Sequence, residues 1–174
     1  SPWLDINPMW SPDGGSLAFQ SDRQGRMEVW TMNADGAEQR QRSTVGSAGH
    51  FTPWETDGRS LLFRPARPDQ PVARLTVADG RLAPLDVRGG AHMSFAPGDT
   101  MVADVVGHRQ VWVSPLGAAP GTPRAAPSMV FAFDDPDIRI DYPVWSPDGR
   151  WLLFDRLKPE GGDIWLLEPL PRAK

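Results

Sequence analysis

The sequence predicts an all-β protein, a β-propeller made of four repeats of a four-stranded antiparallel sheet, or blade. Four times along the chain an aromatic residue comes just before a tight turn, and a short apolar strand follows the turn. The repeats are roughly 40 to 50 residues apart, a period typical of propeller blades. The motifs read WSPDG at 10–14, WETDG at 54–58, FAPGD at 95–99 and WSPDG at 145–149.

The first repeat shows why each unit should fold as a meander of hairpins. After the aromatic residue, Pro12 fixes φ near −65°, Asp13 can accept a hydrogen bond from its local backbone, and Gly14 tolerates a positive φ. Two further turns of similar composition divide the remainder into short runs of β-branched and aromatic residues. The predicted strands are about 7–10, 16–20, 28–32 and 39–43.

The same plan predicts blades at 7–45, 50–88, 91–133 and 141–170. In the third blade Phe95 replaces tryptophan, and we place its fourth strand at 129–133, beyond an exposed loop at 117–127 that is rich in proline, glycine and alanine. The fourth blade lacks an outer strand, because two prolines follow Leu167. Residues 1–6 could supply this strand and close the ring. The alternatives are that the chain is part of a larger ring, or that two copies form a dimeric ring.

Composition excludes several other classes of protein. The 174 residues are 40% hydrophobic and 23% charged, which suits a globular core, and the chain has no cysteine for a disulfide or a thiolate metal site. The net charge of −4 argues against a nucleic-acid partner. No apolar run approaches the roughly 18 residues of a membrane span, and the N-terminus lacks the pattern of a signal peptide.

Two stretches of the chain carry a resemblance to a known family. NPMWSPDGGSLAFQS at 7–21 with VWTMNADG at 29–36, and YPVWSPDGRWLLFD at 142–155 with GDIWLL at 162–167, resemble the repeat of TolB-like β-propellers. Such repeats occur in the periplasmic Tol-Pal protein, in propellers of prolyl-oligopeptidase-like peptidases, in oligogalacturonate lyases and in sensor proteins. The resemblance implies a periplasmic or extracellular location and a protein or peptide partner.

The candidate ligand-binding residues lie where the innermost strands begin. His50 and His92 come four and three residues before the aromatic residue of their blades, and Asn7 and Asp141 correspond to them in the other two blades. These positions should open onto the mouth of the central channel. Imidazole and carboxylate suit several divalent ions, so His50, His92 and Asp141 are a candidate metal site. The resemblance to metal-holding lyase propellers supports this hypothesis, whereas simple binding of water is the alternative.

Two other polar features allow weaker predictions. Asp134, Asp135 and Asp137, together with Asp141, could bind calcium, but they lack the spacing of an EF-hand, and a solvated acidic loop is the competing interpretation. His108 follows Gly107 in a predicted hairpin turn, so we expect it to be exposed and without a role.

Most of the eight tryptophans are explained by their place in the repeat. Large aromatic side chains fill the space between adjacent blades, which accounts for six of them without a carbohydrate ligand. The six are Trp10, Trp54 and Trp145 at the heads of repeats, and Trp30, Trp112 and Trp165 in third strands.

No motif for catalysis is present in the sequence. The chain has no Gly-x-Ser-x-Gly motif and no cysteine nucleophile. The sequence therefore predicts a non-catalytic module that presents its channel mouth to a protein, peptide or small polar ligand. The alternative is an enzyme-associated propeller, either of the metal-dependent polysaccharide lyase type or the gating domain of an oligopeptidase-like peptidase.

Overall fold

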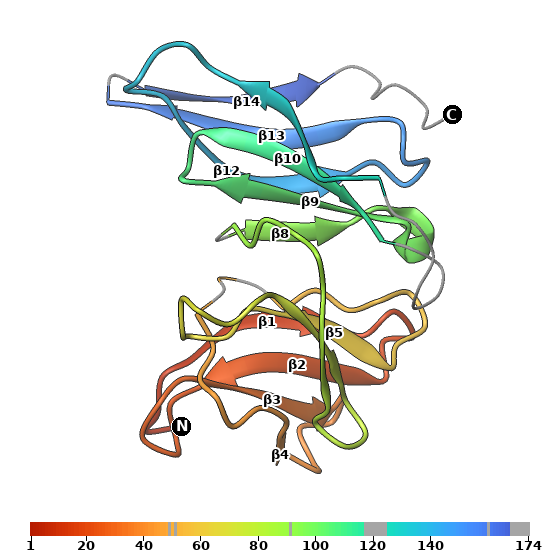
Figure 1. Ribbon diagram of the computed structural model, residues 1–174. Coiled ribbons are helices and arrows are strands. Elements are labelled where there is room, and N and C mark those ends of the chain that lie inside the picture. Colours follow the sequence, from red (N-terminus) through yellow and green to blue (C-terminus); the bar gives the residue numbers. More distant parts are fainter. Residues whose placement is uncertain (49, 51, 91, 117–124, 160, 168–174) are drawn as a thin grey trace. The chain divides into compact units, whose positions relative to one another are not determined.

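The computed structural model describes residues 1–48, 50, 52–90, 92–116, 125–159 and 161–167. These residues form fourteen strands in four antiparallel sheets, with one short 3₁₀ helix (Figure 1). The chain divides into two compact units, Ser1–Leu85 and Asp86–Lys174, each with two sheets. In the part of the chain that is described, no helix has the length and apolar character needed to cross a membrane.

The first sheet of unit one has four strands in sequence order. Its first turn forms as predicted: the N–H of Gly14, which has φ 69°, donates to the carbonyl of Ser11 at 2.9 Å. Of the predicted closure segment 1–6, Asp5 and Ile6 belong to the inner strand of this same sheet. The strands are β1 (Asp5–Trp10), β2 (Ser16–Ser21), β3 (Glu28–Asn33) and β4 (Arg40–Gln41).

The second sheet packs against the first through a shared core. Trp54 forms an isolated bridge with Leu61 in the position of an inner strand, and it clusters with Ala18 and Val29 of the first sheet. The indole Nε1 of Trp54 also donates to the carbonyl oxygen of Met9 at 3.0 Å. The strands are β5 (Ser60–Phe63), β6 (Ala73–Thr76) and β7 (Leu82–Pro84).

Unit two repeats this arrangement with a third and a fourth sheet. The third sheet contains β8 (His92–Phe95), β9 (Met101–Val106), β10 (Gln110–Pro115) and β11 (Ser128–Ala132), with the 3₁₀ helix Pro97–Asp99 between β8 and β9. β11 overlaps the predicted range 129–133, whereas residues 117–124 of the predicted loop lie outside the described residues. The fourth sheet contains β12 (Arg139–Trp145), β13 (Leu152–Lys158) and β14 (Gly161–Leu167).

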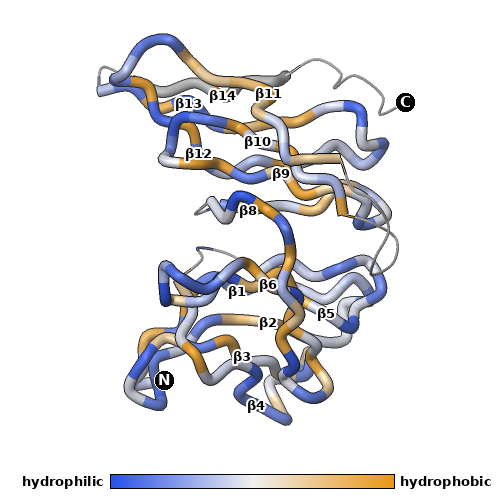
Figure 2. The backbone as a smooth tube through the Cα atoms, in the orientation of Figure 1, coloured by the Kyte–Doolittle hydropathy of each residue, from blue (hydrophilic) through white to orange (hydrophobic). Residues whose placement is uncertain are grey.

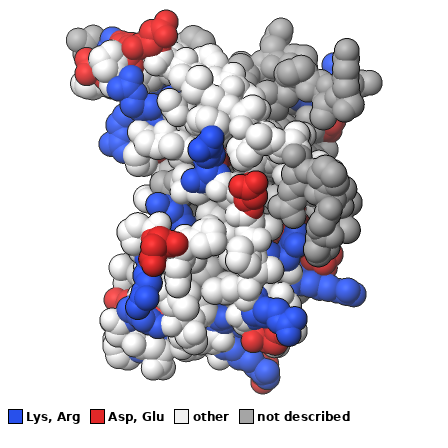
Figure 3. All heavy atoms as spheres, in the orientation of Figure 1, with Lys and Arg blue, Asp and Glu red and all other residues white. Residues whose placement is uncertain are grey.

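The core of unit two lies between its two sheets. Ala103 and Val105 of β9 pack with Trp145 of β12 and with Leu152 and Phe154 of β13. Hydrophobic residues recur along the strands, and hydrophilic residues gather in the turns between them (Figure 2). On the face drawn in Figure 3, basic and acidic side chains are interspersed.

The tryptophans at the heads of the repeats have different environments. Trp54 and Trp145 are buried against the preceding sheet, at 8% and 7% exposure, as expected for packing between blades. Trp10 is 58% exposed, so the expectation of burial is wrong for this residue. The reason is that no described sheet precedes the first one.

Candidate functional site

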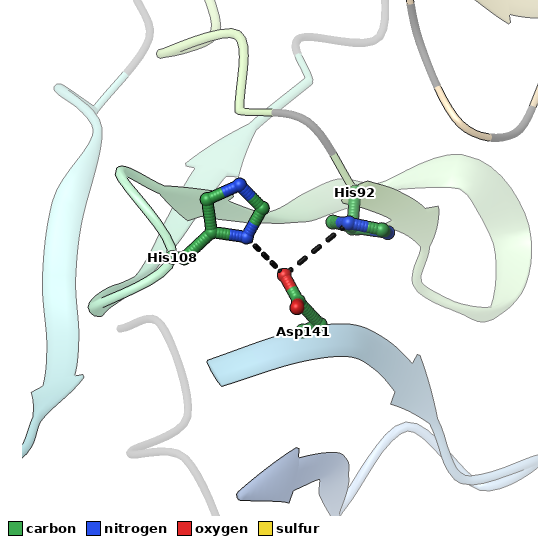
Figure 4. A group of neighbouring side chains, drawn as sticks. All are labelled: His92, His108 and Asp141. Carbon is green, nitrogen blue, oxygen red and sulfur yellow. Dashed lines mark hydrogen bonds and ion pairs between the residues drawn. The ribbon is translucent and has the colours of Figure 1, made fainter. Parts of the chain in front are cut away.

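Two histidines from distant parts of unit two converge on one carboxylate oxygen of Asp141. His92 Nε2 lies 3.2 Å from Asp141 Oδ1, and His108 Nδ1 makes a close contact with the same oxygen (Figure 4). The three potential ligand atoms all lie within 4.8 Å of one another. Among the described residues, this His92–His108–Asp141 cluster is the one group of three or more acidic or histidine side chains that converges in this way.

The first two members are positioned by equivalent places in neighbouring inner strands. His92 begins β8 and is paired with Val105 of β9, while Asp141 lies in β12 and is paired with Asp155 of β13. The residue paired with His92 lies three positions along β9 from the residue paired with the aromatic residue of that sheet. The residue paired with Asp141 has the same spacing along β13. The Asp141 N–H donates to Asp155 Oδ1 at 2.7 Å, which fixes the backbone at this point.

The third member is held by a tight turn between β9 and β10. Gly107 and His108 both have positive φ, at 61° and 56°, and the Arg109 N–H donates to the Val106 carbonyl at 3.2 Å. These features define a type I′ turn, which demands a left-handed conformation from both central residues. The His108 carbonyl accepts a hydrogen bond from the Ile140 N–H at 2.8 Å, so the turn is fastened to β12 beside Asp141.

The cluster is mostly buried and open on one side. The side chains of His92 and Asp141 are 2% and 10% exposed, whereas that of His108 is 34% exposed. The Tyr142 ring packs edge-on against His92, with ring centroids 4.3 Å apart. A small ligand could therefore reach the cluster past His108.

His108 is less exposed than the sequence predicted, because its side chain contacts Asp141 and is 34% exposed. It does lie in a turn, but that turn packs on β12, more than thirty residues further along the chain. A hairpin motif specifies the local backbone only, so the contact with Asp141 could not be read from the residues around His108.

Asn7 occupies a different place from the one its spacing indicated. The pairing of β1 with β2 shifts between Ile6 and Met9, and that of β12 with β13 shifts between Asp141 and Val144. Each shift is a β-bulge that inserts one residue with positive φ, Asn7 in the first sheet and Tyr142 in the fourth. The residue of β1 that corresponds to Asp141 is thus Ile6.

The remaining predicted site residues lie elsewhere. The Asn7 amide donates to Gln20 Oε1 at 3.1 Å within unit one, and His50 is an exposed residue of that unit. Asp135 forms an ion pair with Lys158 at 2.9 Å and accepts a hydrogen bond from the Asp137 N–H at 3.0 Å. Hydrogen bonding to Lys158 lowers the pKa of Asp135. Asp134 and Asp137 are exposed, and with Asp135 they form no converging group among the described side chains.

The chemistry of the cluster follows from its donors and acceptors. An ionised carboxylate only accepts hydrogen bonds, so a ring nitrogen that faces Asp141 Oδ1 has to carry a proton to make a favourable contact. Two imidazole nitrogens and one carboxylate oxygen are also a common ligand set for divalent first-row ions. The cluster can therefore act as a hydrogen-bonding site for a polar ligand or as a set of metal ligands.

Comparison with known proteins identifies the fold. No family model matches the chain. TolB from Acinetobacter baumannii superposes with a TM-score of 0.71 at 15% identity, over 94% of this chain and 40% of that one. The chain has a TolB-like β-propeller fold. An oligogalacturonate lyase in complex with manganese gives a TM-score of 0.54 at 12% identity, over 95% of this chain and 63% of the lyase.

A curated relative carries a peptidase name. The uncharacterized peptidase YuxL of Bacillus subtilis is 28% identical over 170 residues, which is 93% of this chain. The chain spans only 24% of the length of YuxL. The proteins that resemble this chain therefore carry quite different names, and a shared fold does not determine function.

Proposed function

We propose that this chain is a non-catalytic propeller segment that binds a peptide or small polar ligand at the His92–His108–Asp141 cluster. The observation that carries the proposal is the convergence of two imidazoles on one largely buried carboxylate, with access past the half-buried His108. Binding sites typically combine a few converging polar groups with an apolar surround, and Tyr142 supplies part of that surround.

The residues of the chain favour binding over catalysis. Covalent catalysis needs an activated nucleophile beside its base, and the chain has neither cysteine nor a Gly-x-Ser-x-Gly motif. The cluster supplies two potential bases and one carboxylate, which suits recognition of a hydrogen-bonding ligand. The polar cluster beside the Tyr142 ring suits a peptide end or a polar side chain.

A peptide-binding experiment tests this proposal. A library of random heptapeptides is incubated with the chain, and both retained peptides and new cleavage products are identified by mass spectrometry. We expect retained peptides whose binding falls at least tenfold in His108→Ala, with no cleavage. Asp137→Ala serves as the control, because Asp137 is exposed and outside the cluster. Cleavage by the purified chain, or equal retention by His108→Ala, would contradict the proposal.

The second candidate function is the propeller part of a larger peptidase. The relation to YuxL over 93% of this chain favours it. In such a protein the propeller would bind or admit peptides, while the catalytic residues would lie in another domain. Sequencing the complete gene tests this candidate: a hydrolase domain with a serine nucleophile supports it, and a gene without one refutes it.

We assign partner binding to an exposed face of the first sheet and an exposed face of the fourth sheet. On the fourth sheet, the face turned away from the third exposes Val144, Leu153, Leu157 and Ile164. Leu153 of the fourth sheet is equivalent in register to Ala103 of the third sheet. Ala103 packs against the fourth sheet, so Leu153 lies on the face that would pack against a further sheet. On the first sheet, exposed Trp10 holds the place of buried Trp145. The exposed face of the fourth sheet and the exposed face of the first sheet are thus of the two kinds that pack together between adjacent blades.

For the isolated chain, we assign this contact to a second copy. Two copies paired in this way would complete a larger ring, each covering the free faces of the other. Light scattering should give a mass of twice 19.2 kDa. Ile164→Asp, at a position 77% exposed in the described structure, should restore a single copy without unfolding it. A wild-type chain that stays a single copy at high concentration rejects this assignment.

We also place the protein in the periplasm or outside the cell, because its repeats resemble those of TolB-like propellers. The absence of cysteine is compatible with either location. Fractionation of cells that express the complete gene tests this placement, and recovery in the cytoplasmic fraction would contradict it.

A further inference from the structure

The His92–His108–Asp141 cluster has the donor set of a metal site, and its potential ligand atoms lie close together. Zinc and similar ions bind imidazole nitrogen and carboxylate oxygen at about 2.0–2.2 Å, which places neighbouring ligand atoms about 3.0–3.5 Å apart. The His92 Nε2 to Asp141 Oδ1 distance of 3.2 Å falls in this range. The largest separation among the three atoms is within 4.8 Å, so a modest rotation of one side chain would bring all three onto one ion.

The backbone holds the three ligands in place from separate directions. The type I′ turn and the hydrogen bond from Ile140 to the His108 carbonyl fix His108, and the Asp155 carboxylate fixes the backbone of Asp141. His92 is fixed by the β8–β9 pairing and by the ring of Tyr142. Because anchored ligands lose little conformational freedom on binding, this arrangement lowers the entropic cost of binding an ion.

The asymmetric burial of the cluster leaves room for a partly open coordination sphere. His92 and Asp141 are almost inaccessible, whereas His108 borders the solvent. Three protein ligands with further positions open to water are the arrangement of catalytic and exchangeable metal sites, in contrast to the four protein ligands of structural zinc.

We propose that His92, His108 and Asp141 bind one divalent first-row transition ion, with water in the remaining positions. Two imidazoles favour ions such as Zn²⁺, Co²⁺ or Ni²⁺ over Mg²⁺ and Ca²⁺, which prefer oxygen ligands. The ligand set differs from the one that the sequence predicted, because His108 takes the place given to His50. The inference does not rest on peptide binding, since the ion is measured on the chain by itself.

Titration of the metal-free chain with ZnCl₂ alone, followed by calorimetry, tests the assignment. We expect one saturable site per chain that also binds Co²⁺ with visible d–d absorption and resists competition by excess Mg²⁺. In His108→Ala and Asp141→Asn the affinity should fall at least tenfold. Asp137→Asn removes the same charge as Asp141→Asn from an exposed position of the same unit, and it should bind like the wild type.

Two further measurements keep the result independent of folding defects. Mn²⁺ added to the wild-type chain should broaden the imidazole NMR signals of His92 and His108 before all others. His50→Ala should retain the wild-type affinity. The proposal is overturned by the absence of a saturable Zn²⁺ site, by unchanged affinity in folded His108→Ala, or by a tenfold loss in His50→Ala. Loss of peptide binding with Zn²⁺ affinity intact would instead refute only the proposed function.

Discussion

Asp104 should make the stability of the protein depend on pH in an unusual direction. This residue lies in β9, and its side chain is fully buried. Burial raises the pKa of Asp104 from 3.8 to about 6, although the N–H groups of Gly89 and Gly90 and the charge of Arg88 oppose the rise. Among the described groups, Asp104 Oδ1 has no hydrogen-bond partner, so the ionised form is poorly compensated.

The sign and the size of the effect follow from proton linkage. The folded state binds the Asp104 proton more tightly than the unfolded state, so this stabilising contribution is complete below pH 3.8 and is lost as the pH rises through about 6. This difference between the pKa of Asp104 in the unfolded state and in the folded state corresponds to about 3 kcal/mol of unfolding free energy. For a chain of this length, 1 kcal/mol shifts the melting temperature by roughly 2–4 °C.

Asp104→Asn is the perturbation that isolates this contribution. The amide has nearly the same shape as the protonated acid and does not ionise, so the variant should gain stability over the wild type as the pH rises from 4 to 7. Urea unfolding at each pH gives the difference. Hydrogen bonds from neighbouring side chains lower the pKa of Asp13, Asp135 and Asp148, but these groups are common to both proteins and cancel. A difference that stays constant across this pH range would refute the reasoning.

Four other substitutions test the packing. Trp145→Ala should lower the unfolding free energy by about 3–5 kcal/mol because it empties a buried site, whereas Trp10→Ala, at an exposed site, should cost under about 1 kcal/mol in urea unfolding. Glu28→Gln should lower the unfolding free energy by about 1–3 kcal/mol. The buried Glu28 carboxylate accepts hydrogen bonds from a serine hydroxyl and a backbone N–H, and the NH₂ group of glutamine would place a donor against one of these donors. Gly90→Ala should lower the melting temperature by several degrees, because its Cβ would collide with the carbonyl of Val105; a calorimetric trace identical to wild type would contradict this.

The turn motifs were sufficient to predict the sheets. Tight turns with proline, aspartate and glycine specify hairpins through local backbone preferences, and the four motifs therefore place the sheets along the chain. Among the described residues, the inner strand predicted for the second sheet is represented by an isolated bridge between Trp54 and Leu61. Local chemistry predicts where hairpins form, while the length of a strand depends on its neighbours.

The candidate site could be predicted only in part. The repeat places His92 and Asp141 near the start of neighbouring inner strands, and the structure brings the two side chains together. His108 was missed because its contact with β12 joins segments that no local pattern relates. Asn7 was misplaced by the bulge that it forms, although Asn7-Pro8 and Tyr142-Pro143 offered a signal, since an X-Pro pair stands at both bulges.

Equivalent residues of a repeat have the same position in the backbone of their sheets but different neighbouring side chains. Trp10 and Trp145 both end an inner strand and precede the same Ser-Pro-Asp-Gly turn, yet one is 58% and the other 7% exposed. A residue in a stack of sheets is buried by the adjacent sheet, so its position in the repeat predicts a packing surface and not whether another sheet covers it.

The same argument applies to the His92–His108–Asp141 cluster. Asp141 has its histidine partners because the third sheet supplies them, and Ile6, its counterpart in the first sheet, has no carboxylate to offer. A polar site in such a protein therefore belongs to a pair of blades, and the pair that carries it here is the third and the fourth.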